Sequence, residues 1–281
     1  MSQAVRRLKC RKRKAFMKIF NRKLKITSFA LLTLCMVFVM TACAENSSQS
    51  EKSQPAEQTT VQPTTMSAEE INERKLDKFI ADMTLEEKVG QMFFVRCPDE
   101  GAVQQVSEYN IGGYILFGRD FDGKTKDEVL DDIHSYQNEA DIPLLIGVDE
   151  EGGTVVRVSS NPNLRETPFL SPKDTYADGG WDAVKQDAEE KADLLFSLGI
   201  NVNLAPVCDM TSDEYGFMYD RSFSVDVDME NRYVRTVVET SKSKKLGTVL
   251  KHFPGYGNNS DTHTGIAYDN RDYSEFENTD F

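Results

Sequence analysis

Residues 111–148, IGGYILFGRDFDGKTKDEVLDDIHSYQNEADIPLLIGV, decide the fold class of this chain. The stretch opens on an apolar run at 111–118, continues through a polar-apolar helical pattern at 124–139, and returns to an apolar run at 143–148. Both apolar runs are continuous rather than alternating, which indicates strands with both faces buried, as in a parallel sheet. The order strand, helix, strand therefore predicts a βαβ unit.

The same alternation continues on both sides of this unit. The further expected elements are a strand at 89–96, a helix at 99–109, a helix near 181–198, a strand at 200–207, a helix near 229–245 and a strand at 246–251. Five strands in strict alternation with helices leave two architectures, a doubly wound sheet or a (β/α)₈ barrel.

Two observations favour the barrel. No GxGxxG motif follows the first strand, so the usual sign of a dinucleotide-binding sheet is missing. Polar groups come directly after the expected strands, at Asp149, Asp209 and Lys251, and a barrel collects its catalytic groups at those strand ends. We predict an α/β fold of the (β/α)₈ TIM-barrel type, truncated here after about five βα units.

The N-terminal segment has the pattern of a secretion signal. Residues 1–43 hold 11 of the 33 Lys and Arg residues and none of the 46 Asp and Glu residues. The uncharged run 26–42 (ITSFALLTLCMVFVMTA) follows these basic residues and ends at Cys43, which resembles a bacterial lipobox. We interpret 1–43 as a lipoprotein signal peptide with Cys43 as the lipidation site, and an uncleaved membrane anchor is the alternative. Either places the protein on the extracellular face of the bacterial cytoplasmic membrane.

The remainder of the chain is acidic and divides into a tether and a domain. Residues 44–66 are rich in Ser, Thr, Gln, Glu and Pro, which predicts a disordered tether. Ser67 followed by Glu70 is a helix-capping signature, and we take 67–281 as the catalytic domain. An acidic surface repels phosphates, so we expect no nucleic-acid partner.

The segment after the last expected strand carries the most specific chemistry. Residues 251–257 (KHFPGYG) are followed by Asp261, Thr262 and His263. In an extended loop, residues two apart share a face, so the Asp261 carboxylate can orient the His263 imidazole for proton transfer near neutral pH. Taken alone, an Asp-x-His pair also fits a structural loop bond or a metal pair. No CxxC or Cys/His ligand spacing elsewhere suggests zinc, and we expect neither a metal nor a cofactor.

KHFPGYG with a downstream DTH resembles the signature of the β-N-acetylhexosaminidase branch of glycoside hydrolase family 3. The resemblance implies that His263 is the general acid/base and Asp261 its dyad partner, and that Lys251 and His252 bind substrate hydroxyls. Many members carry His at the position of Tyr256 and Ser at that of Thr262, and neither difference touches the dyad.

Two more segments carry the same resemblance. Residues 147–157 (GVDEEGGTVVR) are similar to the family's third-strand motif, which implies that Asp149 and Arg157 bind the sugar. Residues 220–223 (DRSF) are similar to the family's motif after strand 4, which adds Arg221 as a third sugar contact. A carboxylate accepts hydroxyl protons, and guanidinium groups offer planar donor forks.

The resemblance implies a retaining exo-hydrolase of terminal β-linked N-acetylglucosamine, acting on cell-wall or chitin-type oligosaccharides. Such an enzyme also needs a nucleophile, in this family an Asp on strand 7, which we expect beyond Phe281. The open alternatives are a β-glucosidase-type member, a phosphorolytic member that uses phosphate in place of water, and an inactive sugar-binding lipoprotein fragment.

Overall fold

The computed structural model describes residues 67–280, which belong to two compact units, one ending at Met83 and one beginning at Thr84. The signal peptide predicted at 1–43, the lipidation site at Cys43 and the tether predicted at 44–66 lie outside the described residues. Between residues 67 and 280, no helix combines the length and the apolar character needed to cross a membrane.

The described part of the first unit is one helix, α2, Ala68–Ala81. Its start confirms the capping signature read from the sequence. The Ser67 hydroxyl accepts from the Glu70 backbone N–H at 3.2 Å, and the Glu70 carboxylate accepts from the Ser67 backbone N–H at 2.7 Å. This reciprocal pair satisfies two backbone donors that the first helical turn leaves unpaired.

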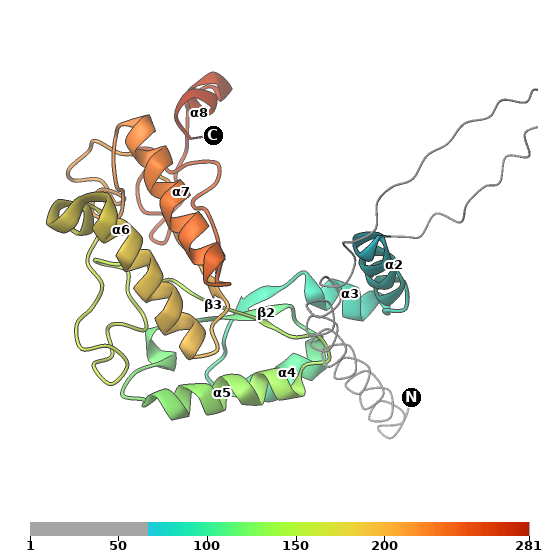
Figure 1. Ribbon diagram of the computed structural model, residues 1–281. Helices are drawn as coiled ribbons and strands as arrows, with labels where there is room; N and C mark the ends of the chain where they lie inside the picture. The colour runs from blue at the N-terminus through green and yellow to red at the C-terminus, as the bar shows by residue number, and fades with distance from the viewer. Residues whose placement is uncertain (1–66, 281) are drawn as a thin grey trace, which may run out of the picture. The chain divides into compact units, whose positions relative to one another are not determined.

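The second unit is built on a five-stranded parallel sheet in the order β1-β2-β3-β4-β5 (Figure 1). The strands are β1 Phe94–Arg96, β2 Gly113–Leu116, β3 Leu145–Val148, β4 Val202–Asn203 and β5 Gly247–Thr248. Each strand pairs with the next one along the chain, and the order never reverses. A doubly wound sheet reverses at its switch point, whereas a barrel adds strands consecutively. The sheet therefore confirms the barrel-type prediction.

Side chains as well as backbone fix the register between neighbouring strands. Asn203 accepts from the Glu150 backbone N–H and donates to the Glu150 carbonyl, both at 3.0 Å. Across β1 to β3, the ring of Phe94 occupies the space above Gly147, where a Cβ atom would lie 2.4 Å from the ring. Glycine at 147 thus lets a side chain of β1 reach over β3.

Helices precede and connect the strands, and several begin at a side-chain cap. In chain order they are α3 Leu85–Gln91, α4 Ala102–Tyr109, the 3₁₀ turn η1 Gly118–Asp120, α5 Lys126–Glu139, α6 Pro172–Ser197, α7 Val227–Ser243 and α8 Tyr273–Thr279. Helices α4 and α5 pack against each other, as do α6 and α7.

Two expected elements begin elsewhere than predicted, and one helix was not predicted. Residues 89–91, expected in the first strand, end helix α3, because Thr84 and Glu87 form a capping box that starts a helix at Leu85. The helix expected near 181–198 begins at Pro172 behind the Ser171 cap, and it is broken at Gly179 and Gly180. Helix α8 was not expected.

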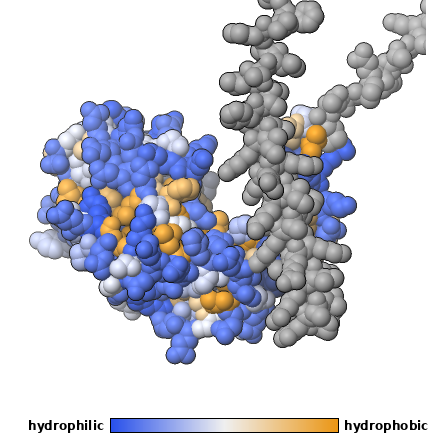
Figure 2. All heavy atoms as spheres, turned by 60° about the horizontal axis from the view of Figure 1, so that its bottom comes forward, coloured by the Kyte–Doolittle hydropathy of each residue, from blue (hydrophilic) through white to orange (hydrophobic). Residues whose placement is uncertain are grey.

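The core lies between the sheet and the helices. Tyr114, Ile146 and Val148 of the strands are fully buried with Ile133 of α5 and Leu195 of α6. Burying apolar side chains of this size contributes about 1.5–3 kcal/mol each. Figure 2 shows that hydrophilic residues cover most of the visible surface of this unit, as the acidic composition indicated.

Candidate active site

The polar residues predicted for the site lie where β3, β4 and β5 end. Asp149 directly follows β3, and Arg221 lies in the long segment after β4. Lys251 forms a parallel bridge to Val207 just beyond β5. Consecutive parallel strands therefore bring together residues that are up to about a hundred positions apart in sequence.

Four of these side chains form a charged quartet, which we define as Asp149, Glu151, Arg221 and Lys251. The Lys251 Nζ atom lies 2.5 Å from Asp149 Oδ1 and 2.5 Å from Glu151 Oε1. Arg221 donates two hydrogen bonds to the Glu151 carboxylate, from Nε at 2.9 Å and from Nη2 at 2.8 Å. Two carboxylates and two cations balance, so the quartet has no formal net charge.

Glu151 is the centre of the quartet. Its side chain is 3% exposed, compared with 10% for Arg221 and 12% for Lys251. Burial alone would raise the pKa of Glu151, but the hydrogen bonds and charges of Arg221 and Lys251 outweigh burial and hold that pKa below its ordinary value. Glu151 therefore remains an anion that fixes both cations.

The neighbouring carboxylate, Glu150, faces away from the quartet and folds its own loop. Its oxygens accept from the backbone N–H groups of Arg157, Val158 and Ser159 at 2.9, 2.7 and 3.3 Å, and from the Ser159 hydroxyl. Glu150 is fully buried. The loop after β3 is thus held by one carboxylate while the residues on either side of it face the site.

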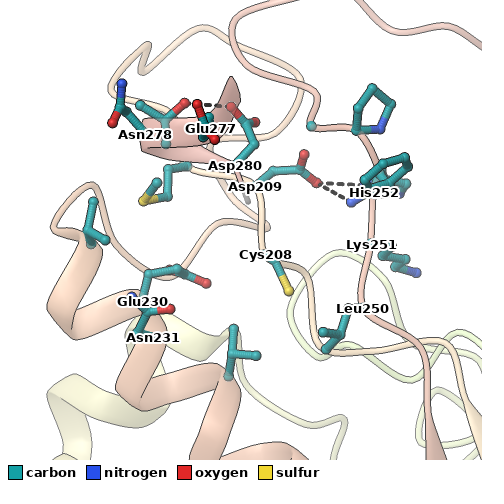
Figure 3. A pocket seen from close by; sticks show the side chains of 17 residues that line it. Cys208, Asp209, Glu230, Asn231, Leu250, Lys251, His252, Glu277, Asn278 and Asp280 are labelled. Carbon is teal, nitrogen blue, oxygen red and sulfur yellow. Dashed lines mark hydrogen bonds and ion pairs between the residues drawn. The ribbon is translucent and has the colours of Figure 1, made fainter. Parts of the chain in front are cut away.

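A second pair is formed by Asp209 and His252, which face each other in Figure 3. Asp209 Oδ2 lies 2.7 Å from His252 Nδ1 and accepts from the His252 backbone N–H at 3.0 Å. The Asp209 side chain is fully buried. Arg221 Nη2 lies 3.4 Å from the other ring nitrogen of His252, which connects this pair to the quartet.

The Asp261–His263 pair lies on the loop after β5. His263 Nδ1 is 2.6 Å from Asp261 Oδ1, and the His263 backbone N–H donates to the same oxygen at 2.9 Å. The hydrogen bonds from His263 lower the pKa of Asp261. The His263 side chain is 78% exposed, so its ring is open to an incoming molecule.

Phe217, from the segment after β4, lies close to both the Asp261–His263 pair and the charged quartet. Its ring centroid lies 6.0 Å from that of His263 and 5.5 Å from that of Tyr256. The guanidinium of Arg221 lies 5.3 Å from the same centroid. The exposed dyad and the buried quartet therefore meet around one aromatic ring.

Arg157, predicted as a sugar contact, lies in different surroundings. Its guanidinium is 5.9 Å from the Phe117 ring centroid, and that of Arg96 is 4.7 Å from the same centroid. No hydrogen bond or ion pair joins Arg157 to Asp149 in the part of the chain that the structure describes. Six of the seven predicted sugar and dyad residues have polar contacts with one another or with Glu151 and Asp209, whereas Arg157 does not.

Sequence reasoning missed two residues of the site, Glu151 and Asp209. The spacing of Asp149 and Glu151 could have found the first, because residues two apart in an extended segment share a face. Asp209 was recognised as a polar residue after β4 but was given no role, since its partner His252 is 43 positions away.

A cavity of about 460 Å³ lies behind this edge, between α7, α8 and the segments that follow β4 and β5 (Figure 3). Glu230 lines it, and within residues 67–280 its buried Oε1 atom has no hydrogen-bond partner. Burial, together with the charge of Asp209, raises the pKa of Glu230 to about 8. Across the same described residues, no group of three or more His, Cys, Asp or Glu side chains is arranged to hold a metal ion.

The consecutive parallel strands and the polar groups at their ends define a protein of the (β/α)-barrel class. The chain belongs to glycosyl hydrolase family 3, because residues 84–281 match the model of the glycosyl hydrolase family 3 N terminal domain.

Named relatives fit this assignment. A β-hexosaminidase of Methylobacillus flagellatus is 32% identical over 192 residues, covering 63% of this chain and 51% of the relative. The β-hexosaminidase LpqI of Mycobacterium tuberculosis is 33% identical over 187 residues, covering 64% and 45%. A solved family 3 β-N-acetylglucosaminidase from Paenibacillus sp. has a TM-score of 0.63 at 25% identity, covering 70% of this chain and 38% of that one. The chain spans about half the length, or less, of these relatives.

Proposed function

We propose that this chain provides the sugar-binding groups and the acid/base of a retaining exo-β-N-acetylhexosaminidase. The enzyme would release terminal β-linked N-acetylglucosamine from cell-wall or chitin-type oligosaccharides. The 2.6 Å contact between His263 Nδ1 and Asp261 Oδ1 carries the proposal. Membership of glycosyl hydrolase family 3 and relatives named β-hexosaminidase support the reaction class.

The dyad assigns one nitrogen of His263 to the chemistry. Nδ1–H donates to Asp261, so Nε2 is the atom that exchanges a proton with the substrate. In the first step Nε2–H protonates the leaving oxygen while the C1–O bond breaks and a carboxylate bonds to C1. In the second step Nε2 takes a proton from the water that attacks C1 and releases the carboxylate. We assign that nucleophilic carboxylate to a part of the enzyme outside residues 67–280.

The quartet and His252 would bind the terminal sugar. Lys251 engages Asp149 Oδ1, so we assign Oδ2 of Asp149 to a sugar hydroxyl. The hydrogen-bond donors for the sugar would come from Lys251, Arg221 and His252. The Glu151 carboxylate holds the first two in place, and the Asp209 carboxylate holds His252. Preorganised donors and acceptors of this kind give orientation at little entropic cost. Arg157 remains a predicted contact for the part of the substrate that approaches Phe117.

The test is a comparison of leaving groups in the full-length protein. His263→Ala should lower the rate on N,N′-diacetylchitobiose by about 10²–10⁴-fold, since general acid/base help is worth that much. A nitrophenyl glycoside, whose leaving group needs little protonation, should lose far less in kcat/KM, which reports the first step. His134→Ala, on helix α5, is the matched control and should behave as wild type. Equal losses on both substrates would remove His263 from the role of acid.

We also propose that the enzyme is anchored to the extracellular face of the cytoplasmic membrane by a lipid on Cys43. The support is the basic, then apolar, then Met-Thr-Ala-Cys order of residues 1–43. A palmitate analogue should label wild type and leave Cys43→Ala unlabelled, with Cys97→Ala, a buried thiol, as the control. Equal labelling of wild type and Cys43→Ala would place the lipid elsewhere or nowhere.

A further inference from the structure

The loop that carries the dyad has little packing to hold it. Thr262 and His263 are exposed, and the Asp261 side chain is 28% exposed. General acid catalysis needs the donor within hydrogen-bond reach of the leaving oxygen, and a displacement of 1 Å can cost about 10²-fold in rate. Polar contacts must therefore fix the position of this loop.

Tyr256 makes the contacts that reach the dyad. Its hydroxyl accepts from the Thr262 backbone N–H at 2.7 Å and lies 2.8 Å from the Thr262 Oγ1 atom. Thr262 stands between Asp261 and His263, so both dyad residues are joined to the atom that Tyr256 holds. One hydroxyl thus constrains the backbone of the whole Asp-Thr-His segment.

Tyr256 is itself anchored to the buried part of the site. Its backbone N–H donates to Asp209 Oδ1 at 2.6 Å, while the other oxygen of Asp209 takes His252. Its ring meets that of His252 edge-on, with centroids 5.5 Å apart and the planes at 74°. A fully buried carboxylate therefore fixes the base of Tyr256, and the hydroxyl at its tip supports the exposed loop.

We propose that Tyr256 is a positioning residue that fixes the position of the Asp261–His263 dyad relative to the Asp209–His252 pair. Its hydroxyl transmits the position of the buried pair to the exposed one through Thr262. The inference rests on the proposed function, since it assigns Tyr256 a part in the same proton transfer. It adds a residue that binds neither the substrate nor the proton.

The first experiment removes single hydroxyls from the full-length protein. Tyr256→Phe keeps the ring and its backbone contact with Asp209 but loses both bonds to Thr262, each worth a factor of about 2–13. We expect kcat/KM on N,N′-diacetylchitobiose to fall by about 10–100-fold, with a much smaller fall in kcat/KM on a nitrophenyl glycoside, whose first step needs little protonation, and an unchanged Kd for N-acetylglucosamine. Tyr215→Phe, which removes the same atom from a ring that is 98% exposed, should match wild type.

Variants at Thr262 distinguish the loss of the Tyr256–Thr262 hydrogen bonds from a general loss of packing in the loop. Thr262→Val keeps the backbone donor and removes only Oγ1, so its loss should be smaller than that of Tyr256→Phe. Thr262→Ser retains the hydroxyl and should restore the wild-type ratio between the two substrates. Combining Tyr256→Phe with Thr262→Val should cost no more than Tyr256→Phe alone, because both changes remove the same contact.

A readout independent of activity completes the test. The His263 ring Hε1 signal can be identified by NMR because it is the one that disappears in His263→Ala, and that of His134 is identified in the same way with His134→Ala. Tyr256→Phe should shift or broaden the His263 signal and leave that of His134 unchanged. An unmoved His263 signal, or equal losses on both substrates, overturns the positioning role. If His263→Ala itself shows no dependence on the leaving group, the proposed function fails, and the NMR result alone still decides whether Tyr256 positions the loop.

Discussion

Replacing Glu151 by Gln should destabilise the protein more than the same replacement at an exposed carboxylate. The Glu151 carboxylate takes three charge-assisted contacts, from Arg221 Nε and Nη2 at 2.9 and 2.8 Å and from Lys251 Nζ at 2.5 Å. The amide can keep one of these as an acceptor, and it leaves two nearly buried cations with Asp149 as their remaining carboxylate in the quartet. Breaking a buried pair in this way costs about 3–5 kcal/mol.

Urea unfolding measures this cost as a fall in the midpoint at an unchanged slope. The matched control is Glu190→Gln. The Glu190 side chain is 46% exposed, and its carboxylate lies 3.2 Å from Arg165. An exposed ion pair of this kind contributes about 0–1 kcal/mol. Exchanging Glu151 and Arg221 together for Leu and Met should cost less than Glu151→Gln, since no cation loses its partner while Lys251 keeps Asp149. A cost for Glu151→Gln no larger than that of Glu190→Gln would refute the buried quartet.

Two further predictions concern Glu230 and Arg271. The pKa of Glu230 rises from 4.5 to about 8 in the fold, so the folded protein binds a proton that the unfolded chain releases. The contribution of Glu230 to stability should therefore fall between about pH 4.5 and pH 8 by about 5 kcal/mol. Glu230→Gln should remove that fall in urea midpoints, and an unchanged pH dependence would contradict it. Arg271 donates to the Gly255 carbonyl at 3.0 Å and lies 2.7 Å from Asp269, whose pKa it lowers to about 2. Arg271→Gln should therefore speed proteolysis between residues 255 and 271 several-fold. A cleavage rate equal to that of wild type would show that the contacts of Arg271 with Gly255 and Asp269 do not hold the loop.

Much of the fold could be predicted because strands buried in a parallel sheet are continuous apolar runs. The runs at 111–118 and 143–148 contain β2 and β3, and the polar residues after them mark the edge where the site lies. Residues 89–91 misled because Val89 continues the apolar pattern of β1, while the signal that decides their structure is the capping box at Thr84 and Glu87. A local hydrogen-bonding motif outweighed the hydropathy pattern there.

The site was predicted only in part, for a different reason. The Asp261–His263 contact is local, so two-residue spacing is enough to suggest it. The partners Glu151–Arg221 and Asp209–His252 are separated by 70 and 43 positions, and only the fold brings them together. Which face each carboxylate presents also depends on loop geometry, as Glu150 shows by turning inward beside two residues that face the site.

The most direct test of the account is chemical rescue of His263→Ala by azide, followed by NMR of the product. Azide needs no deprotonation, so it should replace water in the second step, attack C1 of the glycosyl-enzyme and release the enzyme carboxylate. If His263 is the acid/base, azide restores turnover of a nitrophenyl N-acetylglucosaminide by His263→Ala, and the product is the β-glycosyl azide. Asp261→Asn should be rescued less, because its imidazole remains. Turnover by His263→Ala that azide leaves unchanged, with no glycosyl azide formed, would contradict a role for His263 as the acid/base of a retaining enzyme.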